Sequence, residues 1–234
     1  MADAAAGAPP AAARSRGPVL ALGDSIMSGP EEGSYRVPPR AWPEWIAALL
    51  DLPLHRIARP GASAPDLAAR ELSRIRDDYA VACVGIGTND VRSPDWDAAR
   101  YTRALDTVLT AVAARSERRC IATVPLDLGR PRAGAKVAEL NGIVRDVAQS
   151  HGFAVVSLDD FGGWRWWFPD AVHPTALGQL EIARRAARAL ALGQDPAQLA
   201  PPASGPRSDL HYAATRQIGH LWRDHWRRRA ERNV

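Results

Sequence analysis

Residues 19–26 read VLALGDSI, so that four apolar residues run directly into Gly23, Asp24 and Ser25. A short, continuous apolar run is typical of a buried strand, and Gly-Asp at its end is turn chemistry. We therefore expect a strand over residues 18–23 that delivers a serine hydroxyl at its carboxyl end. Open parallel sheets form their sites at that end of the strands.

Four further apolar runs repeat this pattern and alternate with segments of helical periodicity. The expected strands are 54–58, 79–87, 119–125 and 153–158. The expected helices are 42–50, 63 to about 76, a helix capped by Ser93-Pro94-Asp95 that ends near 115, 136–150, and one from Thr175 to about 193. Apolar strands that alternate with amphipathic helices imply a parallel sheet covered on both faces. The predicted fold class is α/β, a three-layer α/β/α sandwich with a five-stranded, flavodoxin-like parallel sheet.

The two ends of the chain differ in composition from this core of residues 17–193. Residues 1–16 are rich in alanine and proline, and we expect them to be disordered. Residues 194–208 contain four prolines and one glycine and are expected to be a linker. Residues 209–234 are expected to form a basic amphipathic C-terminal helix, with an apolar stripe of Ile218, Leu221, Trp222 and Trp226.

The positive charge of the chain lies in its tail. The formal net charge is +4, and residues 207–234 hold seven arginines against three acidic residues, so the body is neutral overall. A neutral body with no base-reading motif argues against a nucleic-acid partner. The apolar stripe of the tail is expected to dock on its own domain or on a second copy. The alternative is contact with an anionic membrane surface.

No segment reaches the roughly 18 apolar residues of a transmembrane span. The alanine-rich N-terminus lacks the apolar core of a secretion signal. Cys83 and Cys120 both lie in or beside apolar runs and are expected to be buried, unpaired thiols of a reducing compartment. These features predict a cytoplasmic protein. The oligomeric state is left open.

Three more short motifs follow the predicted strands. They are Gly61-Ala62-Ser63, Gly87-Thr88-Asn89-Asp90 and Asp170-Ala171-Val172-His173-Pro174. Because the carboxyl ends of parallel strands meet at one edge of a sheet, we expect all three motifs to gather around Ser25.

The residue types in these motifs suit nucleophilic catalysis. A serine hydroxyl needs a base, and His173 can act as one near neutral pH, with Asp170 three residues earlier to orient its ring. The negative charge on a substrate carbonyl needs hydrogen-bond donors. The candidates are the backbone N–H groups of Ser25 and Gly61 and the side-chain amide of Asn89.

This pattern resembles the SGNH, or GDSL, hydrolase family, whose four signature residues match Ser25, Gly61, Asn89 and His173. Asp170 stands in the Asp-x-x-His motif of that family, and Ile26 replaces the leucine of Gly-Asp-Ser-Leu. The resemblance covers about residues 18–193. It implies the SGNH hydrolase fold and an esterase, lipase, thioesterase or carbohydrate deacetylase that acts on a small-molecule ester. It implies no metal and no organic cofactor.

The same residues are compatible with two other functions. An acyltransferase that moves the acyl group to a sugar or alcohol would use every residue named, so the motifs do not separate transfer from hydrolysis. A function of another class is a non-catalytic binding module that has kept the fold, although Ser25, Asn89 and His173 are all present. Asp24, Thr88 and Asp90 are assigned structural roles in turns.

Five aromatic residues occur within residues 161–168, just before the Asp-x-x-His motif. One interpretation is a loop that packs on the core. The other is a substrate wall for an acyl chain or a sugar face. Its candidate residues are Trp164, Trp166, Trp167 and Phe168.

Overall fold

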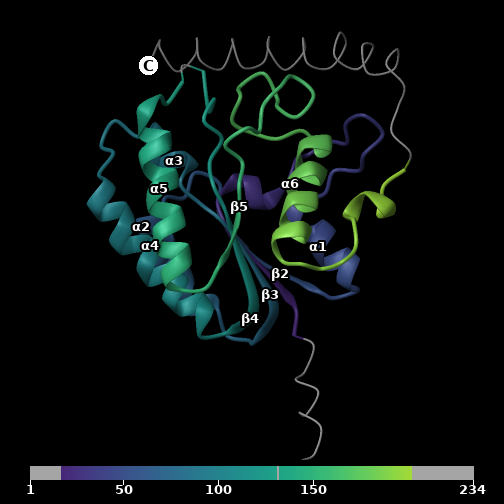
Figure 1. The fold of residues 1–234 in the computed structure, drawn as a ribbon, viewed down its shortest axis with the longest axis horizontal. Helices are drawn as coiled ribbons and strands as arrows, with labels where there is room; N and C mark the ends of the chain where they lie inside the picture. Colours follow the sequence, from purple (N-terminus) through teal and green to yellow (C-terminus); the bar gives the residue numbers. More distant parts are fainter. Residues whose placement is uncertain (1–16, 131, 202–234) are drawn as a thin grey trace, which may run out of the picture.

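The computed structural model describes residues 17–130 and 132–201, and within them five parallel strands form one sheet in the order β2-β1-β3-β4-β5 (Figure 1). The strands are β1 (Val19–Gly23), β2 (Leu54–Ala58), β3 (Tyr79–Gly85), β4 (Ser116–Ala122) and β5 (Ala154–Val156). This confirms the predicted α/β fold. The expected N-terminal tail, the C-terminal helix and the last part of the linker lie outside the described residues.

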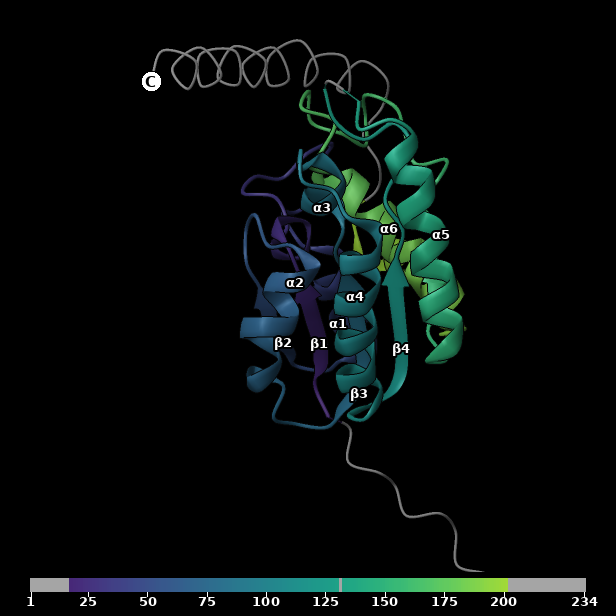
Figure 2. The same ribbon diagram turned by 90° about the vertical axis from the view of Figure 1, so that its left-hand side faces the viewer.

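Helices cover both faces of the sheet. The longer ones are α1 (Trp42–Leu50), α4 (Ala98–Ala113), α5 (Ala135–Ser150) and α6 (Ala176–Ala189). The short ones are α2 (Ala64–Asp66) and α3 (Thr88–Arg92), together with 3-10 turns at Ser25–Ser28, Leu72–Arg74 and Pro196–Leu199 and a π-helical turn at Leu67–Glu71. Helices α2, α4 and α5 cover one face, and α1 and α6 cover the other (Figures 1 and 2).

Each central strand contributes to two separate cores, one on each face of the sheet. In β1, Leu20 and Leu22 pack toward α4 and α5, whereas Val19 and Ala21 pack toward α1 and α6. All four side chains are fully buried. A strand buried on both faces has no polar alternation, which explains the unbroken apolar run in the sequence. Cys83 and Cys120 are buried on the α1 and α6 face, and neither is in a disulfide.

The structure corrects several predicted boundaries. Strand β3 ends at Gly85 rather than 87, β4 ends at Ala122 rather than 125, β5 covers only Ala154–Val156, and α6 ends at Ala189 rather than near 193. Strand β4 begins at Ser116 rather than 119, because Ser116 and Arg118 already pair with β3, although Glu117 and Arg118 are exposed. The end of a strand that faces solvent carries polar residues. The apolar run in the sequence therefore begins after the first residues of the strand and does not show where the strand starts.

The cap of α4 is also corrected. Asp97, not Ser93, is its N-cap, since the Asp97 carboxylate accepts a hydrogen bond of 2.9 Å from the N–H of Arg100. The predicted helix over residues 63 to 76 has its Ser63–Asp66 capping box, but it continues as π-helical and 3-10 turns. Pro196–Leu199, inside the expected linker, forms a 3-10 helix near α1 and α6.

The strand order reverses between β1 and β3. A sheet of order 2-1-3-4-5 opens a crevice at this switch point, outside the carboxyl ends of the strands. Figure 2 shows β1 and β4 pointing toward the same end of the molecule. Ser25 directly follows β1 and Asn89 lies shortly after β3, so the topology places both at the crevice.

Candidate active site

Ser25 lies in a tight turn, residues 23–28, which we call the nucleophile turn. The Asp24 side chain caps its 3-10 helix by accepting a hydrogen bond of 2.9 Å from the N–H of Ile26. The backbone N–H of Asp24 donates to the carbonyl of Gly85 on β3, at 3.3 Å. Gly23 has φ +155°, and a Cβ there would lie 1.9 Å from the Gly85 carbonyl oxygen. Only glycine allows this approach of the two strands.

The structure brings Ser25, His173 and Asp170 together in a hydrogen-bonded chain. The Ser25 Oγ lies 3.0 Å from His173 Nε2, and His173 Nδ1 lies 2.6 Å from Asp170 Oδ2. Serine and histidine are 148 residues apart in sequence. With a proton on Nδ1 donated to Asp170, Nε2 is free to accept the proton of the serine hydroxyl.

His173 and Asp170 lie in a loop, residues 166–174, which we call the base loop. The second carboxylate oxygen of Asp170 accepts hydrogen bonds from the N–H groups of Val172 and His173, at 2.9 and 3.1 Å. The N–H of Phe168 donates to the carbonyl of His173, and Trp167 and Pro174 form a bridge of two antiparallel segments. Asp170 therefore shapes its own turn as well as the ring of His173.

The two ionisable groups of the base loop shift each other's pKa. The hydrogen bond to Asp170 raises the pKa of His173 above 6.5, against the opposing effect of burial. Burial acts to raise the pKa of Asp170, but the hydrogen bond and the charge of His173 outweigh it and hold that pKa below 3.8. The arrangement favours an ionised aspartate beside a histidine that takes up a proton readily.

Gly61 and Asn89 lie on the neighbouring segments. Gly61 has φ +75°, a conformation that glycine adopts without strain, and open space surrounds the position of its missing Cβ. Within residues 17–130 and 132–201, no backbone hydrogen bond uses the N–H of Gly61 or Ser25. The Asn89 amide donates one hydrogen bond of 2.9 Å to the carbonyl of Ala62, which leaves its second N–H for a substrate.

Asp90 holds these two segments together. Both of its carboxylate oxygens lie within 3.2 Å of the N–H of Ala64, just beyond Gly61. Burial raises the pKa of Asp90 to about 6 and that of Asp24 to about 7. The structural roles expected for both aspartates fit these contacts. Asp24 Oδ2 is buried and has no hydrogen-bond partner within the part of the chain that the structure describes.

Sequence analysis missed Gln179, a residue that holds the nucleophile turn. It is buried on α6, where its amide donates to the carbonyl of Ile26 and accepts from the N–H of Trp42, each at 2.9 Å. Its position on the apolar face of a predicted helix could have indicated this role, because a buried amide needs hydrogen-bond partners from elsewhere in the fold.

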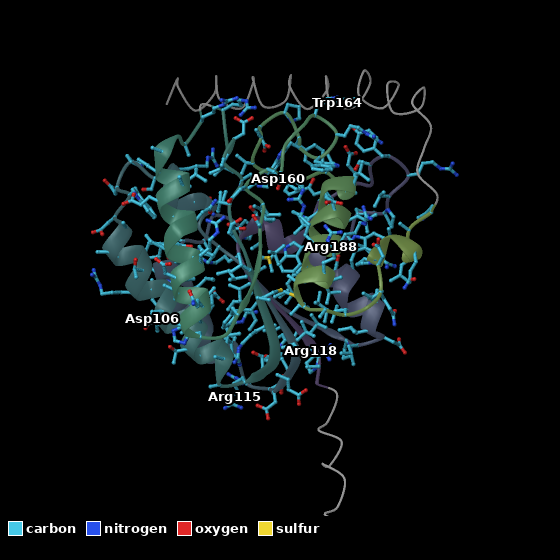
Figure 3. All side chains as sticks on the ribbon, in the orientation of Figure 1. Asp106, Arg115, Arg118, Asp160, Trp164 and Arg188 are labelled. Carbon is cyan, nitrogen blue, oxygen red and sulfur yellow. The ribbon has the colours of Figure 1, made fainter. Side chains whose placement is uncertain are left out.

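The aromatic segment divides into buried and exposed residues. Trp167 is 8% exposed and Trp166 stacks on Phe161, so these two side chains pack on the core. Trp164 is 52% exposed and lies on the loop side of the molecule, toward which the strands point (Figure 3). The backbone of Phe168 serves the base loop. Of the four candidates for a substrate wall, Trp164 alone is largely open to solvent.

Two histidines outside this site have partners of their own. His55 bonds to the Tyr79 hydroxyl and His151 to Asp106, each at 2.8 Å. Among the described residues, no cluster of three His, Cys, Asp or Glu side chains could hold a metal ion. No helix in the same part of the chain is long and apolar enough to cross a membrane. The remaining histidines, at 211, 220 and 225, lie outside the described residues.

Comparison with known sequences identifies the family. The pattern of the GDSL-like lipase/acylhydrolase family matches residues 21–180, which include the nucleophile turn and the base loop. The chain belongs to this family. No curated protein matches the chain significantly.

Solved structures resemble this GDSL-like hydrolase in fold. One is LAE5, an alpha/beta hydrolase enzyme from the Lake Arreo metagenome, with a TM-score of 0.59 and 19% identity over 75% of this chain and 95% of that one. Axe2, an acetylxylan esterase from Geobacillus stearothermophilus, has a TM-score of 0.57 and 18% identity over 76% and 96%. The acetyl xylan esterase AlAXEase has a TM-score of 0.57 and 20% identity over 74% and 98%.

Proposed function

We propose that this GDSL-like hydrolase is a serine esterase that cleaves a carboxylic ester through an acyl-enzyme on Ser25. One observation carries the proposal. The chain of hydrogen bonds from Ser25 Oγ through His173 to Asp170, at 3.0 and 2.6 Å, has the geometry of a nucleophile, its base and the group that orients the base.

The reaction would proceed in two halves. In the first, His173 Nε2 takes the proton of Ser25 as Oγ attacks the ester carbonyl, and the imidazolium then gives that proton to the leaving alcohol. In the second, His173 takes a proton from water, which attacks the acyl-enzyme, and the proton returns to Ser25 as the acid leaves. The N–H groups of Ser25, Gly61 and Asn89 would stabilise the oxyanion in both halves.

A small acyl ester of a carbohydrate is the substrate class that we favour. Two of the structures that resemble this fold are acetylxylan esterases. Trp164, exposed on the loop side, offers an aromatic face on which a sugar ring can stack. Transfer of the acyl group to a sugar or alcohol in place of water is the related alternative, and it would use the same residues.

The test is covalent labelling together with turnover. We expect an organophosphonate to add one mass adduct to the wild type and to Ser73→Ala, an exposed serine far along the chain, but none to Ser25→Ala. We expect hydrolysis of p-nitrophenyl acetate to fall about 10⁶-fold in Ser25→Ala, as for loss of a triad nucleophile. Adduct formation or turnover that survives in folded Ser25→Ala would contradict the proposal.

A further inference from the structure

A buried carboxylate that the proposed proton transfers do not use lies between the two segments that carry oxyanion donors. Gly61 lies in residues 59–64, which we call the glycine segment, and Asn89 lies in residues 87–92, which we call the asparagine segment. Asp90 directly follows Asn89, is 8% exposed, and directs its carboxylate at the glycine segment. Its contacts therefore bear on the distance between the two donors.

Two hydrogen bonds from adjacent residues join these segments. The Asn89 amide donates to the carbonyl of Ala62 at 2.9 Å. The Asp90 carboxylate accepts from the N–H of Ala64, at 3.1 Å to one oxygen and 3.2 Å to the other. In the part of the chain that the structure describes, no other hydrogen bond runs between the two segments. A single bond would let the segments turn about it, whereas two adjacent bonds fix both their spacing and their relative orientation.

The glycine segment is held on both sides of its donor. On one side, the N–H of Arg59 donates to the carbonyl of Gly23 on β1, at 3.1 Å. On the other side, Ala64 begins α2 and is bonded to Asp90. Gly61 lies between these two attachments, and its own N–H has no backbone partner within residues 17–130 and 132–201. The direction of that free N–H is set by the two attachments.

Asn89 alone would hold the segments less precisely. One N–H of its amide bonds to Ala62, and the other is the candidate oxyanion donor. Without the contact from Asp90, movement of the glycine segment would therefore turn the same amide that has to meet the substrate. An oxyanion donor acts from roughly 2.7–3.1 Å. A misplacement of about 1 Å at a catalytic site can lower the rate about 10²-fold.

We propose that Asp90 is a positioning residue for the oxyanion hole, which holds the Gly61 and Asn89 donors at a fixed distance from each other. The inference rests on the proposed serine-esterase function, since these donors serve the oxyanion of the same site. It gives a catalytic consequence to a residue for which the sequence predicted a structural role in a turn. The alternative is that Asp90 only stabilises the start of α2.

The experiment compares Asp90→Ala, which removes the acceptor, with Asp90→Asn, whose amide oxygen can still accept from the N–H of Ala64. We would measure kcat and KM for p-nitrophenyl acetate at pH 8, above the pKa of about 6 to which burial raises Asp90. The affinity for a boronic acid is the second readout, because its tetrahedral adduct with Ser25 carries a negative charge like that of the oxyanion.

Asp159→Ala is the matched control. The Asp159 carboxylate also joins two segments, since it accepts from Asn141 on α5 at 2.9 Å, but it contacts neither donor segment. Circular dichroism and urea titration establish that each variant is folded. Asp90→Leu, which has a similar volume and no acceptor, takes the place of Asp90→Ala if the truncation prevents folding.

We expect Asp90→Ala to lower kcat about 10²-fold with KM within about threefold of the wild type, because the donors act on the transition state more than on the bound ester. The affinity for the boronic acid is expected to fall by a similar factor. Asp90→Asn is expected to recover kcat to within about tenfold of the wild type, and Asp159→Ala to stay within about threefold in both readouts.

Three results would overturn the inference and leave the esterase function intact. They are Ser25-dependent turnover in folded Asp90→Ala or Asp90→Leu equal to that of Asp159→Ala, a loss of kcat with unchanged affinity for the boronic acid, and an Asp90→Asn variant as impaired as Asp90→Ala. Absence of any Ser25-dependent adduct or turnover in the folded wild type removes the esterase function and the inference together.

Discussion

The nucleophile turn and the base loop are positioned in opposite ways. The nucleophile turn depends on distant elements: the Gly85 carbonyl on β3 accepts from Asp24, and Gln179 on α6 donates to Ile26. Met27 is fully buried against Gly23 and Gly85. The base loop is held mostly by hydrogen bonds within its own residues, with Asp170 at their centre.

Because of this difference, substitutions in the two regions are expected to affect different properties, stability in one case and activity in the other. A change in the nucleophile turn disturbs contacts between β1, β3 and α6, so it is expected to affect the free energy of unfolding of the whole domain. A change in the base loop disturbs a local turn and the orientation of one imidazole, so it is expected to affect catalysis first. Four variants test this contrast.

The largest effect is expected from Asp170→Asn. Asparagine keeps an oxygen that can accept from the N–H groups of Val172 and His173, but its amide favours the wrong tautomer of His173. We expect kcat to fall about 10⁴-fold, as in a triad whose aspartate becomes asparagine, with the urea midpoint nearly unchanged.

The pH profile of the same variant is a second readout. The hydrogen bond to Asp170 raises the pKa of His173 above 6.5, and the base must be neutral to act. Wild-type activity is therefore lost as the pH falls through this raised pKa, and the acid limb of Asp170→Asn moves to lower pH. Asp170→Ala, which also removes the turn contacts, is the comparison variant. Equal stability losses in both would argue against a self-contained base loop.

The next effect is expected from Asp24→Asn in the nucleophile turn. Burial raises the pKa of Asp24 from 3.8 to about 7, so the folded state binds its proton more tightly than the unfolded state does. The stability that this proton contributes is fully present below about pH 4 and is lost as the pH rises through 7. At 1.36 kcal/mol per pKa unit, the loss is about 4 kcal/mol.

Urea titrations at pH 4, 6 and 8 measure this loss. Asparagine keeps the cap on Ile26 but does not titrate, so we expect the variant to gain stability relative to the wild type by about 4 kcal/mol between pH 4 and pH 8. A difference between the two proteins that stays constant over this range would show that Asp24 is ionised in the folded state throughout.

Gly23→Ala tests the close approach of β1 and β3. The added Cβ would lie 1.9 Å from the Gly85 carbonyl oxygen and 2.7 Å from a side-chain carbon of Met27, so the strands must move apart. We expect a loss of about 3 kcal/mol in the free energy of unfolding, typical of overpacking.

A glycine elsewhere supplies the control for this substitution. Gly142 lies in α5 with open space around its missing Cβ, and Gly142→Ala is expected to stabilise the domain by up to about 1 kcal/mol. Chemical denaturation measures both changes. If Gly23→Ala were as stable as the wild type, the nucleophile turn would not depend on the spacing of its strands.

The smallest effect is expected from Gln179→Met. Methionine fills the same volume but leaves the carbonyl of Ile26 and the N–H of Trp42 without their partner. Unsatisfied buried polar groups of this kind cost about 2 kcal/mol of stability. Gln198→Met, at an exposed position, is the control and is expected to change stability by less than about 0.5 kcal/mol. Equal urea midpoints for the two variants would show that Gln179 does not stabilise the nucleophile turn.

Sequence predicted the parts of this molecule that follow from local pattern. Unbroken apolar runs marked the buried strands, and the strand-end motifs named the residues that the fold brings together at one edge, Ser25 and His173 among them. The turn of Asp170 and His173 was predictable because its contacts are local.

The parts that sequence did not predict depend on packing partners far along the chain. Strand β4 starts early because its first residues pair with β3, and Gln179 matters only because α6 docks beside the nucleophile turn. The burial of Trp167 likewise depends on its neighbours in three dimensions, since five aromatic residues within a segment of eight show the same pattern in sequence whether they face solvent or the core.

Because Ser25 and His173 are 148 residues apart in sequence, the proposed catalysis would report that the whole span between them has folded. The hydroxyl comes from the first strand and the imidazole from the loop before the last long helix, so no fragment that lacks either end of this span can bring the two together. Recovery of the proposed turnover during refolding is therefore expected to require that the loop before α6 has reached the end of β1. Spectroscopic signals from individual helices are expected to recover earlier, because long-range contacts form late.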